Sequence, residues 1–246
     1  MKQKWNPLQR LWSMSREDRL PPSLSSAMSG NDPGHVAFLR AMAKDIQQSN
    51  SSNLPLESLE VVVMDLETTG FQAFRGDEII SIGAVAMRGA EILEQEDFFS
   101  YINPQRKVPD HIQRLTGITG NTLDVAPDLI TTLSRFFRYV NNRPLVAHHS
   151  RHERDFLQAA LWKTSKTKFT HRLLDTMLLI RLCEGIVGDG SLDALCERNQ
   201  ITIHKRHDAY HDAVAAARLW AVYLEKTMQK GYRSLHEVYQ QMGCRG

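Results

Sequence analysis

The sequence has few cysteines and no long apolar run. Its three cysteines, Cys183, Cys196 and Cys244, are too few and too scattered for a zinc cluster or a disulfide framework, and they suit a reducing compartment. No stretch approaches the ~20 apolar residues that a membrane span needs. Polar residues interrupt the N-terminus too early for a secretory signal. We therefore expect a cytoplasmic protein without a membrane partner.

A strong excess of charge is also lacking. The formal net charge is +2, and hydrophobic residues make up 42% of the chain, as in ordinary globular proteins. The distribution is less even, because residues 135–172 hold nine lysines and arginines but only two acids, Glu153 and Asp155. Such a stretch can hold phosphate groups. A solvated helix face is the alternative, and we would favour it if no further motif were present.

The chain divides into an N-terminal extension and a main domain. Residues 1–57 contain the loop signals Pro21-Pro22 and Asp32-Pro33-Gly34, the polar run 47–53, and one amphipathic segment at 36–46. We interpret 1–57 as a mostly helical or irregular extension of unknown role, and 58–246 as the main domain.

From residue 59 onward the pattern alternates between short apolar runs and helical periodicity. We predict strands at 59–66, 78–87, 92–102, 144–149 and 173–174. Helices are predicted at 110–115, 127–140, 153–162, 176–183, 191–198, 211–228 and 234–241, with Asp175 as a cap of the fourth. Strands followed by interleaved helices and strands indicate an α/β fold with a mixed sheet flanked by helices.

The first motif lies at the end of the first predicted strand and reads Asp65-Leu66-Glu67-Thr68-Thr69-Gly70. Residues i and i+2 of a strand point to the same face, so the carboxylates of Asp65 and Glu67 project together. Two carboxylates converging beside a buried strand repel each other and lose hydration, and a divalent cation removes both penalties. An acidic strand end followed by a Thr-Gly turn is the alternative interpretation.

The second motif reads His207-Asp208-Ala209-Tyr210-His211-Asp212-Ala213 and opens a predicted helix. Beside a metal site, an imidazole with an intrinsic pKa of about 6.5 can take a proton from water near neutral pH. The alternatives are a surface or core histidine at His207 and, at Asp212, an acid favoured by the helix dipole. His204, His207 and His211 also lie close enough for a zinc cluster, but no third ligand with a catalytic partner is evident.

Together the two motifs resemble those of the DEDDh exonuclease family, which includes the proofreading epsilon subunit of bacterial replicative polymerase. The resemblance extends from about residue 59 to 225. It also includes the predicted second strand and the stretch formed by Asn103-Pro104, Val108-Pro109 and Leu115-Thr116-Gly117-Ile118-Thr119. It implies a ribonuclease H-like mixed sheet flanked by helices, and it does not cover residues 1–57.

The middle motif departs from the family pattern. The family usually has an aspartate in the first turn of a helix, whereas aligning His148 and Phe156 places Glu153 at that position. Asp155 is the nearby aspartate, but it would need a two-residue shift and would point off another side of the helix. We therefore predict Glu153, whose carboxylate reaches one methylene farther. A salt-bridged helix acid is the alternative.

The resemblance implies two Mg²⁺ or Mn²⁺ ions, about 4 Å apart, that clamp the scissile phosphate. By this resemblance Asp65 bridges both ions, Glu67 and Asp212 complete the site of the attacking water, and Glu153 holds the second ion. His207 then acts as the general base, which completes the predicted catalytic set.

The resemblance also implies that substrate is bound by the residues that follow Glu67 and by the start of the middle motif: Thr68, Thr69, Gly70, Phe71 and His148. Phe71 is expected to stack on the terminal base, with ordinary packing as the alternative.

We therefore predict a metal-dependent 3′–5′ exonuclease that releases nucleoside monophosphates from single-stranded 3′ ends of DNA, in proofreading or repair. RNA ends or short oligoribonucleotides are the first alternative substrates, because the contact with the 2′-hydroxyl is not visible in a motif. A non-catalytic nucleic-acid-binding module is the second alternative. The candidate partners are a polymerase and a second copy of the chain, although no segment carries a recognisable polymerase-binding signature.

Overall fold

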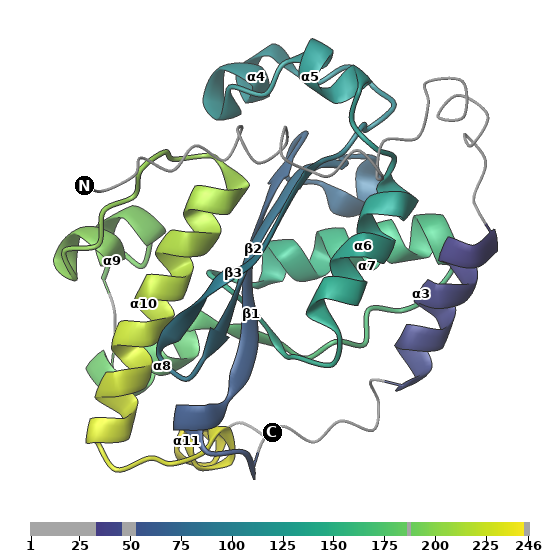
Figure 1. The fold of residues 1–246 in the computed structure, drawn as a ribbon. Coiled ribbons are helices and arrows are strands. Elements are labelled where there is room, and N and C mark those ends of the chain that lie inside the picture. Colours follow the sequence, from purple (N-terminus) through teal and green to yellow (C-terminus); the bar gives the residue numbers. More distant parts are fainter. Residues whose placement is uncertain (1–32, 46–52, 186–187, 244–246) are drawn as a thin grey trace.

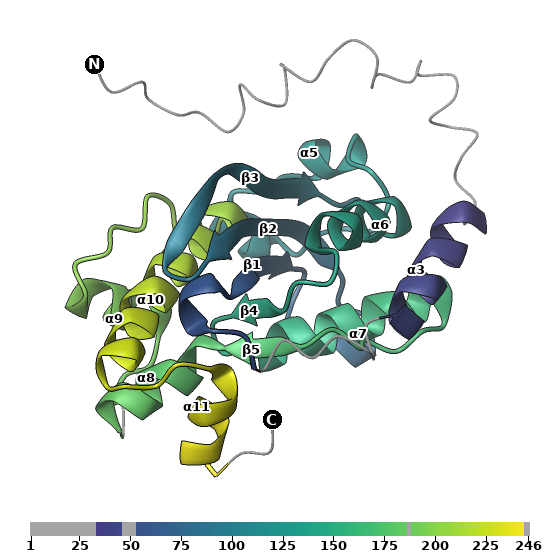
Figure 2. The same cartoon turned by 60° about the horizontal axis from the view of Figure 1, so that its bottom comes forward.

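One five-stranded sheet forms the centre of the computed structural model, which describes residues 33–45, 53–185 and 188–243 (Figures 1 and 2). In chain order the strands are β1 (Glu60–Thr68), β2 (Ile79–Arg88), β3 (Glu91–Tyr101), β4 (Leu145–Ala147) and β5 (Leu173–Asp175). Their order across the sheet is β3-β2-β1-β4-β5. The β1–β2 and β2–β3 pairs are antiparallel, whereas the β1–β4 and β4–β5 pairs are parallel. The sheet is therefore mixed, as predicted.

Helices cover both faces of this sheet. On one side lie α3 (Pro33–Asp45), α6 (Leu129–Val140) and α7 (Arg151–Ser165) (Figure 1). On the other lie α8 (Thr176–Glu184), α9 (Leu192–Arg198), α10 (Ala209–Gln229) and α11 (Leu235–Gln241). Two short helices, α4 (Asp110–Thr116) and α5 (Gly120–Asp124), lie beyond one end of the strands, and two 3-10 turns, η4 (Leu56–Ser58) and η5 (Ala73–Arg75), flank β1. Within the described part of the chain, no helix is both long and apolar enough to span a bilayer.

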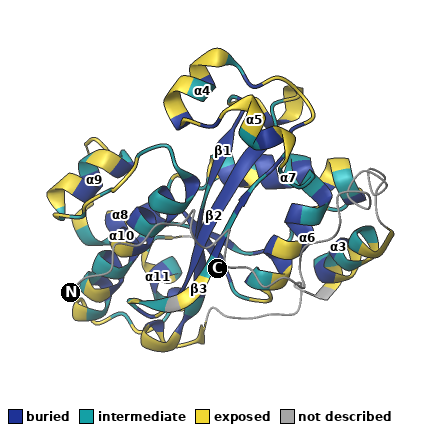
Figure 3. Cartoon of the chain, turned by 45° about the horizontal axis from the view of Figure 1, so that its top comes forward, coloured by how far each residue is buried: buried dark blue, intermediate teal, exposed yellow. Residues whose placement is uncertain are grey.

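The central strand β1 is buried on both faces, which explains its continuous apolar sequence. Val62 and Met64 belong to the core under α6 and α7, whereas Val61 and Val63 belong to the core under α10. This alternation follows the two-residue period of a strand. Figure 3 shows the resulting contrast between the buried strands and the exposed outer surfaces of α4 and α5.

The amphipathic segment predicted in the N-terminal extension forms α3. Its Leu39 side chain is fully buried in the core that α6 and α7 share. The Arg40 Nε donates a hydrogen bond to the carbonyl of Ser165 at 3.0 Å, and the Arg138 guanidinium lies 4.8 Å above the Phe38 ring. Residues 1–32 and 46–52 of the predicted extension lie outside the described residues. The boundary at residue 58 remains a prediction.

Candidate active site

Acidic residues from three separate elements meet at one end of the sheet. Asp65 and Glu67 end β1 on the face that carries Val61 and Val63, which is the face covered by α10. Asp212 lies in the first turn of α10, and Glu153 lies in the first turn of α7. The end of β1 and the start of α10 lie at the same end of the molecule, near α4 and α5 (Figure 1).

The tightest group in this cluster consists of Glu67, His207 and Asp212. Potential ligand atoms of these three side chains all lie within 4.8 Å of one another. Asp65 is not part of that group, but its pKa is raised well above the usual range, first by burial and then by the charges of Glu153, Glu67 and Asp212. The predicted catalytic side chains therefore share one electrostatic environment.

Burial also raises the pKa of the other carboxylates. The pKa of Glu67 is raised to about 8, by burial and then by Asp212. Burial raises the pKa of Glu153 to about 8 and that of Asp212 to about 6. Both Glu153 and Asp212 are almost inaccessible, with exposed fractions of 4% and 3%. The surrounding protein groups therefore do not offset the cost of burying these carboxylates in their charged form.

Two carboxylate oxygens in this cluster are buried without a hydrogen-bond partner, Glu153 Oε2 and Asp212 Oδ1. A buried acceptor left unpaired costs free energy, so such atoms call for a ligand. Carboxylate oxygens are the ligands that Mg²⁺ and Mn²⁺ prefer. The residues present thus fit a divalent cation in both charge and donor type.

The structure places Glu153, rather than Asp155, at the carboxylate cluster. The Glu153 side chain points inward, where its charge acts on Asp65. Asp155 lies on the outer part of α7, with its Oδ2 4.0 Å from Nε of the exposed Arg151. Two positions along a helix rotate a side chain by about 200°, which accounts for the different surroundings.

His207 lies outside α10 and adopts a left-handed backbone conformation, with φ of 56°. Its backbone N–H donates to Asp212 Oδ2 at 3.0 Å, which connects the predicted general base directly to a predicted metal ligand. Burial, and then the charge of Arg206, lower the pKa of the His207 imidazole.

The zinc cluster considered from the sequence is not formed. The prediction that His207 and His211 share one helix with i, i+4 spacing is wrong, because α10 begins only at Ala209. The His211 Nδ1 instead lies 3.0 Å from Asp208 Oδ1, and neither His204 nor His211 belongs to the group around Glu67.

Hydrogen bonds hold the predicted substrate-binding turn in a closed shape. The Thr68 hydroxyl donates to the Gly70 carbonyl at 2.6 Å, and the Thr69 hydroxyl donates to Asp77 Oδ1 at 3.0 Å. The same Thr69 hydroxyl accepts from the Glu78 backbone at 3.0 Å. A Cβ on Gly70 would lie 2.4 Å from the Asp77 carboxylate, so any other residue there would displace the side chain that accepts the Thr69 hydrogen bond.

Phe71 and His148, the other predicted substrate residues, have different surroundings. The Phe71 side chain is 85% exposed, and its ring lies edge-on to that of His152 at 5.9 Å. The His148 ring is held within the protein, with Nδ1 2.7 Å from the Thr176 hydroxyl and Nε2 2.8 Å from the Gly190 carbonyl. Burial lowers the pKa of His148 to about 4. An exposed aromatic ring suits base stacking, whereas the His148 ring connects the segment before α7 to Thr176 and Gly190.

Sequence reasoning gave no specific role to Arg206, which bridges two acids. One guanidinium nitrogen, Nη1, pairs with Asp212 Oδ2, and Nε donates to Asp193 Oδ1 at 2.7 Å. Its position directly before His207 was a signal that it lies near the site.

Asp175 caps α8, as predicted, and its carboxylate also binds the turn before α7. Its carboxylate accepts from the backbone N–H of Met177 at 2.9 Å, which caps α8. It also accepts from the backbone N–H groups of His149 at 3.2 Å and Ser150 at 2.9 Å. Asp175 therefore ties the turn before α7 to the start of α8, and this contact orients the helix that carries Glu153.

Three of the nine basic residues in the stretch 135–172 are engaged by other parts of the protein. Arg138 lies over Phe38, Arg172 lies 4.9 Å from the centre of the Tyr239 ring, and Arg143 pairs with Glu96 at 3.0 Å. These three side chains contact different elements, so they do not form one phosphate-binding patch with each other.

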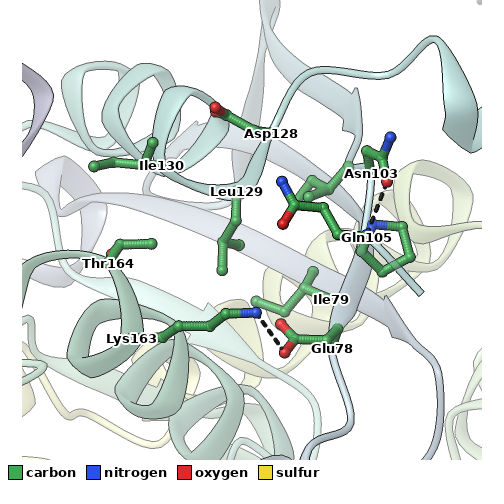
Figure 4. Close-up of a pocket in the computed structure, with 11 residues that line it drawn as sticks. Glu78, Ile79, Asn103, Gln105, Asp128, Leu129, Ile130, Lys163 and Thr164 are labelled. Atoms are coloured by element: carbon green, nitrogen blue, oxygen red, sulfur yellow. Dashed lines mark hydrogen bonds and ion pairs between the residues drawn. The ribbon is translucent and has the colours of Figure 1, made fainter. Parts of the chain in front are cut away.

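A separate cavity of about 340 Å³ lies between the start of β2, the segment after β3, the start of α6 and the C-terminal end of α7 (Figure 4). Lys163 pairs with Glu78 at 2.7 Å on its wall, and the Asn103 side chain accepts from the Gln105 backbone at 2.8 Å. It contains none of the predicted site residues. Glu78 nevertheless connects it to the substrate-binding turn, through backbone pairing with Thr69.

Comparisons with known proteins point to one family. The family model RNase_T, described as an exonuclease, matches residues 62–220. The chain is 32% identical to "DNA polymerase III PolC-type" of Bacillus subtilis over 195 residues, covering 79% of this chain and 13% of that protein. It is 31% identical to "DNA polymerase III subunit epsilon" of Rickettsia typhi over 172 residues, covering 67% of this chain and 74% of that protein.

A similar structure is the nuclease domain of 3′hExo, a DEDDh family member bound to rAMP. It aligns with a TM-score of 0.60 and 17% identity, covering 70% of this chain and 92% of that chain. At this identity the likeness concerns the fold alone. The PolC-type relative is far longer, and the chain spans only 13% of its length.

Proposed function

Since this chain belongs to the exonuclease family described by the RNase_T model, we propose that it is a metal-dependent 3′–5′ exonuclease that removes nucleotides from DNA ends. The observation that carries the proposal is the convergence of Asp65, Glu67, Glu153 and Asp212 with His207, in which two buried carboxylate oxygens have no partner. Four carboxylates with raised pKa values at one point of the molecule favour a cation-binding centre.

By family resemblance, Asp65, Glu67 and Asp212 would hold one divalent cation, and Asp65 with Glu153 a second. Bound there, Mg²⁺ or Mn²⁺ would neutralise charge on the scissile phosphate and make the attacking water more acidic. The unpaired oxygens of Glu153 and Asp212 are the atoms available for this role.

His207 would accept the proton of the attacking water. The lowered pKa keeps its imidazole neutral near pH 7, which is the form that a general base needs. Its backbone bond to Asp212 keeps the imidazole next to the carboxylates. The exposed Phe71 ring would stack on the terminal base, a contact that tolerates any base.

DNA is the proposed substrate because the two relatives reported above are named as DNA polymerase III proteins. The same names support a polymerase as a partner. RNA is the second candidate, since the structurally similar 3′hExo domain is bound to rAMP. The cytoplasmic location remains a prediction.

The test is degradation of 3′-labelled and 5′-labelled single strands of DNA and RNA of one sequence, with Mg²⁺, Mn²⁺ or chelator. Immediate release of labelled mononucleotide from the 3′ end, and its loss with chelator, is the expected result. The ratio of DNA to RNA rates selects the substrate. Binding of both polymers without cleavage under any metal would favour a non-catalytic module instead.

A further inference from the structure

Arg206 is held between two acids that differ in burial. Asp212 has a side chain that is 4% exposed, whereas the side chain of Asp193 is 59% exposed. The guanidinium contacts both, with Nη1 on Asp212 and Nε on Asp193. Arginine suits this position, because its planar fork donates in two directions at once.

The positive charge of Arg206 acts on three of the four carboxylates in the cluster. Burial raises the pKa values of Asp65, Glu67 and Asp212, and for each of them Arg206 is the first influence that opposes the rise. The neighbouring Lys205 is directed elsewhere, to Asp208 at 3.0 Å. Arg206 is thus placed as a counter-charge for acids that would otherwise repel one another.

The contact also engages the carboxylate group that metal binding would require, although through its other oxygen. Asp212 Oδ2 accepts from Arg206 and from the His207 backbone, while Asp212 Oδ1 is unpaired. A divalent cation bound to Asp212 would lie close to the Arg206 guanidinium, and the two positive charges would repel each other. Because Asp193 holds the other side of the guanidinium, Arg206 could leave Asp212 without losing its outer anchor.

We propose that Arg206 is a built-in counter-ion of the carboxylate cluster, which pairs with Asp212 until a divalent cation displaces it. This inference rests on the proposed function. Its consequence is that metal binding and the Arg206–Asp212 ion pair compete. The pair stabilises the metal-free fold and sets how much metal is needed to occupy the site.

The test is Mn²⁺ binding to the full chain, measured by calorimetry without nucleic acid. Arg206→Gln should bind Mn²⁺ about tenfold more tightly, a size typical of coupling within one ion-pair network. In chelator this variant should melt at a lower temperature than the wild-type protein, and saturating Mn²⁺ should reduce the difference. Lys205→Gln is the matched control, because it removes an equal charge next to Arg206 without touching Asp212, and it should change the affinity far less.

A second variant keeps the proposal testable if Arg206→Gln does not fold. Asp193→Asn alters an exposed side chain and removes the outer anchor, so the guanidinium should stay on Asp212 and Mn²⁺ binding should weaken. If Arg206→Gln binds Mn²⁺ no more tightly than the wild-type protein, or if Asp193→Asn binds it equally well, the inference is overturned while the proposed function stands. Absence of Mn²⁺ binding by the wild-type protein would overturn both the inference and the proposed function.

Discussion

Asp65 on β1 lies opposite Gly83 on β2, and the missing side chain at Gly83 lets the start of α10 lie against the sheet beside it. A Cβ at Gly83 would lie 2.3 Å from backbone atoms of Ala209 and Tyr210. Those residues begin the helix that carries Asp212 in its first turn. The distance between the predicted metal ligands Asp65 and Asp212 therefore depends on the absence of a side chain at Gly83.

We expect Gly83→Ala to push the start of α10 away from β1 and thereby separate Asp212 from Asp65. Overpacking of this kind typically costs about 1–3 kcal/mol of stability. Mn²⁺ affinity and cleavage rate should fall by more than the loss of stability explains. Calorimetry and thermal melting measure the two effects. Gly120→Ala is the control, because a Cβ at that position would meet nothing within 4 Å, and equal effects at both glycines would contradict the packing argument.

Asp65→Asn should abolish cleavage while leaving the fold intact. The substitution keeps the shape of the side chain but removes the charge that the metal ions require, so we expect a loss of at least about a hundredfold, as for other groups that stabilise a transition state. Because repulsion from Glu153, Glu67 and Asp212 raises the pKa of Asp65, the metal-free variant should be at least as stable as the wild-type protein. Asp110→Asn, at an exposed ion pair with Lys107, is the control. Retained activity in Asp65→Asn would remove the metal assignment.

Glu153→Gln should reduce activity far more than Asp155→Asn. Glu153 is buried with an unpaired oxygen, whereas Asp155 forms an outer ion pair with Arg151, and surface pairs of this kind contribute only about 0–1 kcal/mol. The two substitutions make the same chemical change two positions apart on one helix. Rates at saturating Mn²⁺ and at limiting Mn²⁺ should both show the difference. The reverse order would mean that the metal ligand is Asp155.

Most of the fold was predictable because its signals are local. The apolar runs that became β1 and β2, and the Asp175 side chain that caps α8, follow from the residues themselves. The predicted exonuclease family and the mixed sheet are confirmed. Helix α5 was not predicted, because five residues beginning at Gly120 carry too little periodicity. The helical spacing of α3 indicated an apolar face but not that α6 and α7 cover it.

The site was predictable in its residue types and less so in its internal contacts. The motifs predicted which carboxylates meet, and the structure brings Asp65, Glu67 and Asp212 to one place. The left-handed backbone of His207 and the pairing of Arg206 with Asp212 result from the way the segment before α10 returns to the sheet. No local pattern encodes such tertiary contacts, so only the folded chain shows them.

The pH dependence of stability provides a test of the carboxylate cluster that needs no substrate. The pKa values of Glu67 and Glu153 are raised to about 8, so near pH 7 the folded protein retains protons there that the unfolded chain has already released. The free energy of unfolding of the metal-free protein should therefore fall as the pH rises from about 4.5 to about 8 and level off above that, with an upper limit of about 1.4 kcal/mol per pH unit for each carboxyl group.

Saturating Mg²⁺ should reverse this trend, because the cation binds the deprotonated carboxylates and its affinity rises with pH. Denaturant unfolding in chelator and in Mg²⁺ at several pH values measures both slopes. Glu67→Gln is the matched control, because it removes one titrating group but leaves Glu153, whose pKa is also raised to about 8. Its metal-free slope should be shallower than that of the wild-type protein. Identical slopes in the two proteins would mean that Glu67 is ionised in the folded state at pH 7, and that a cation is not needed to hold its charge.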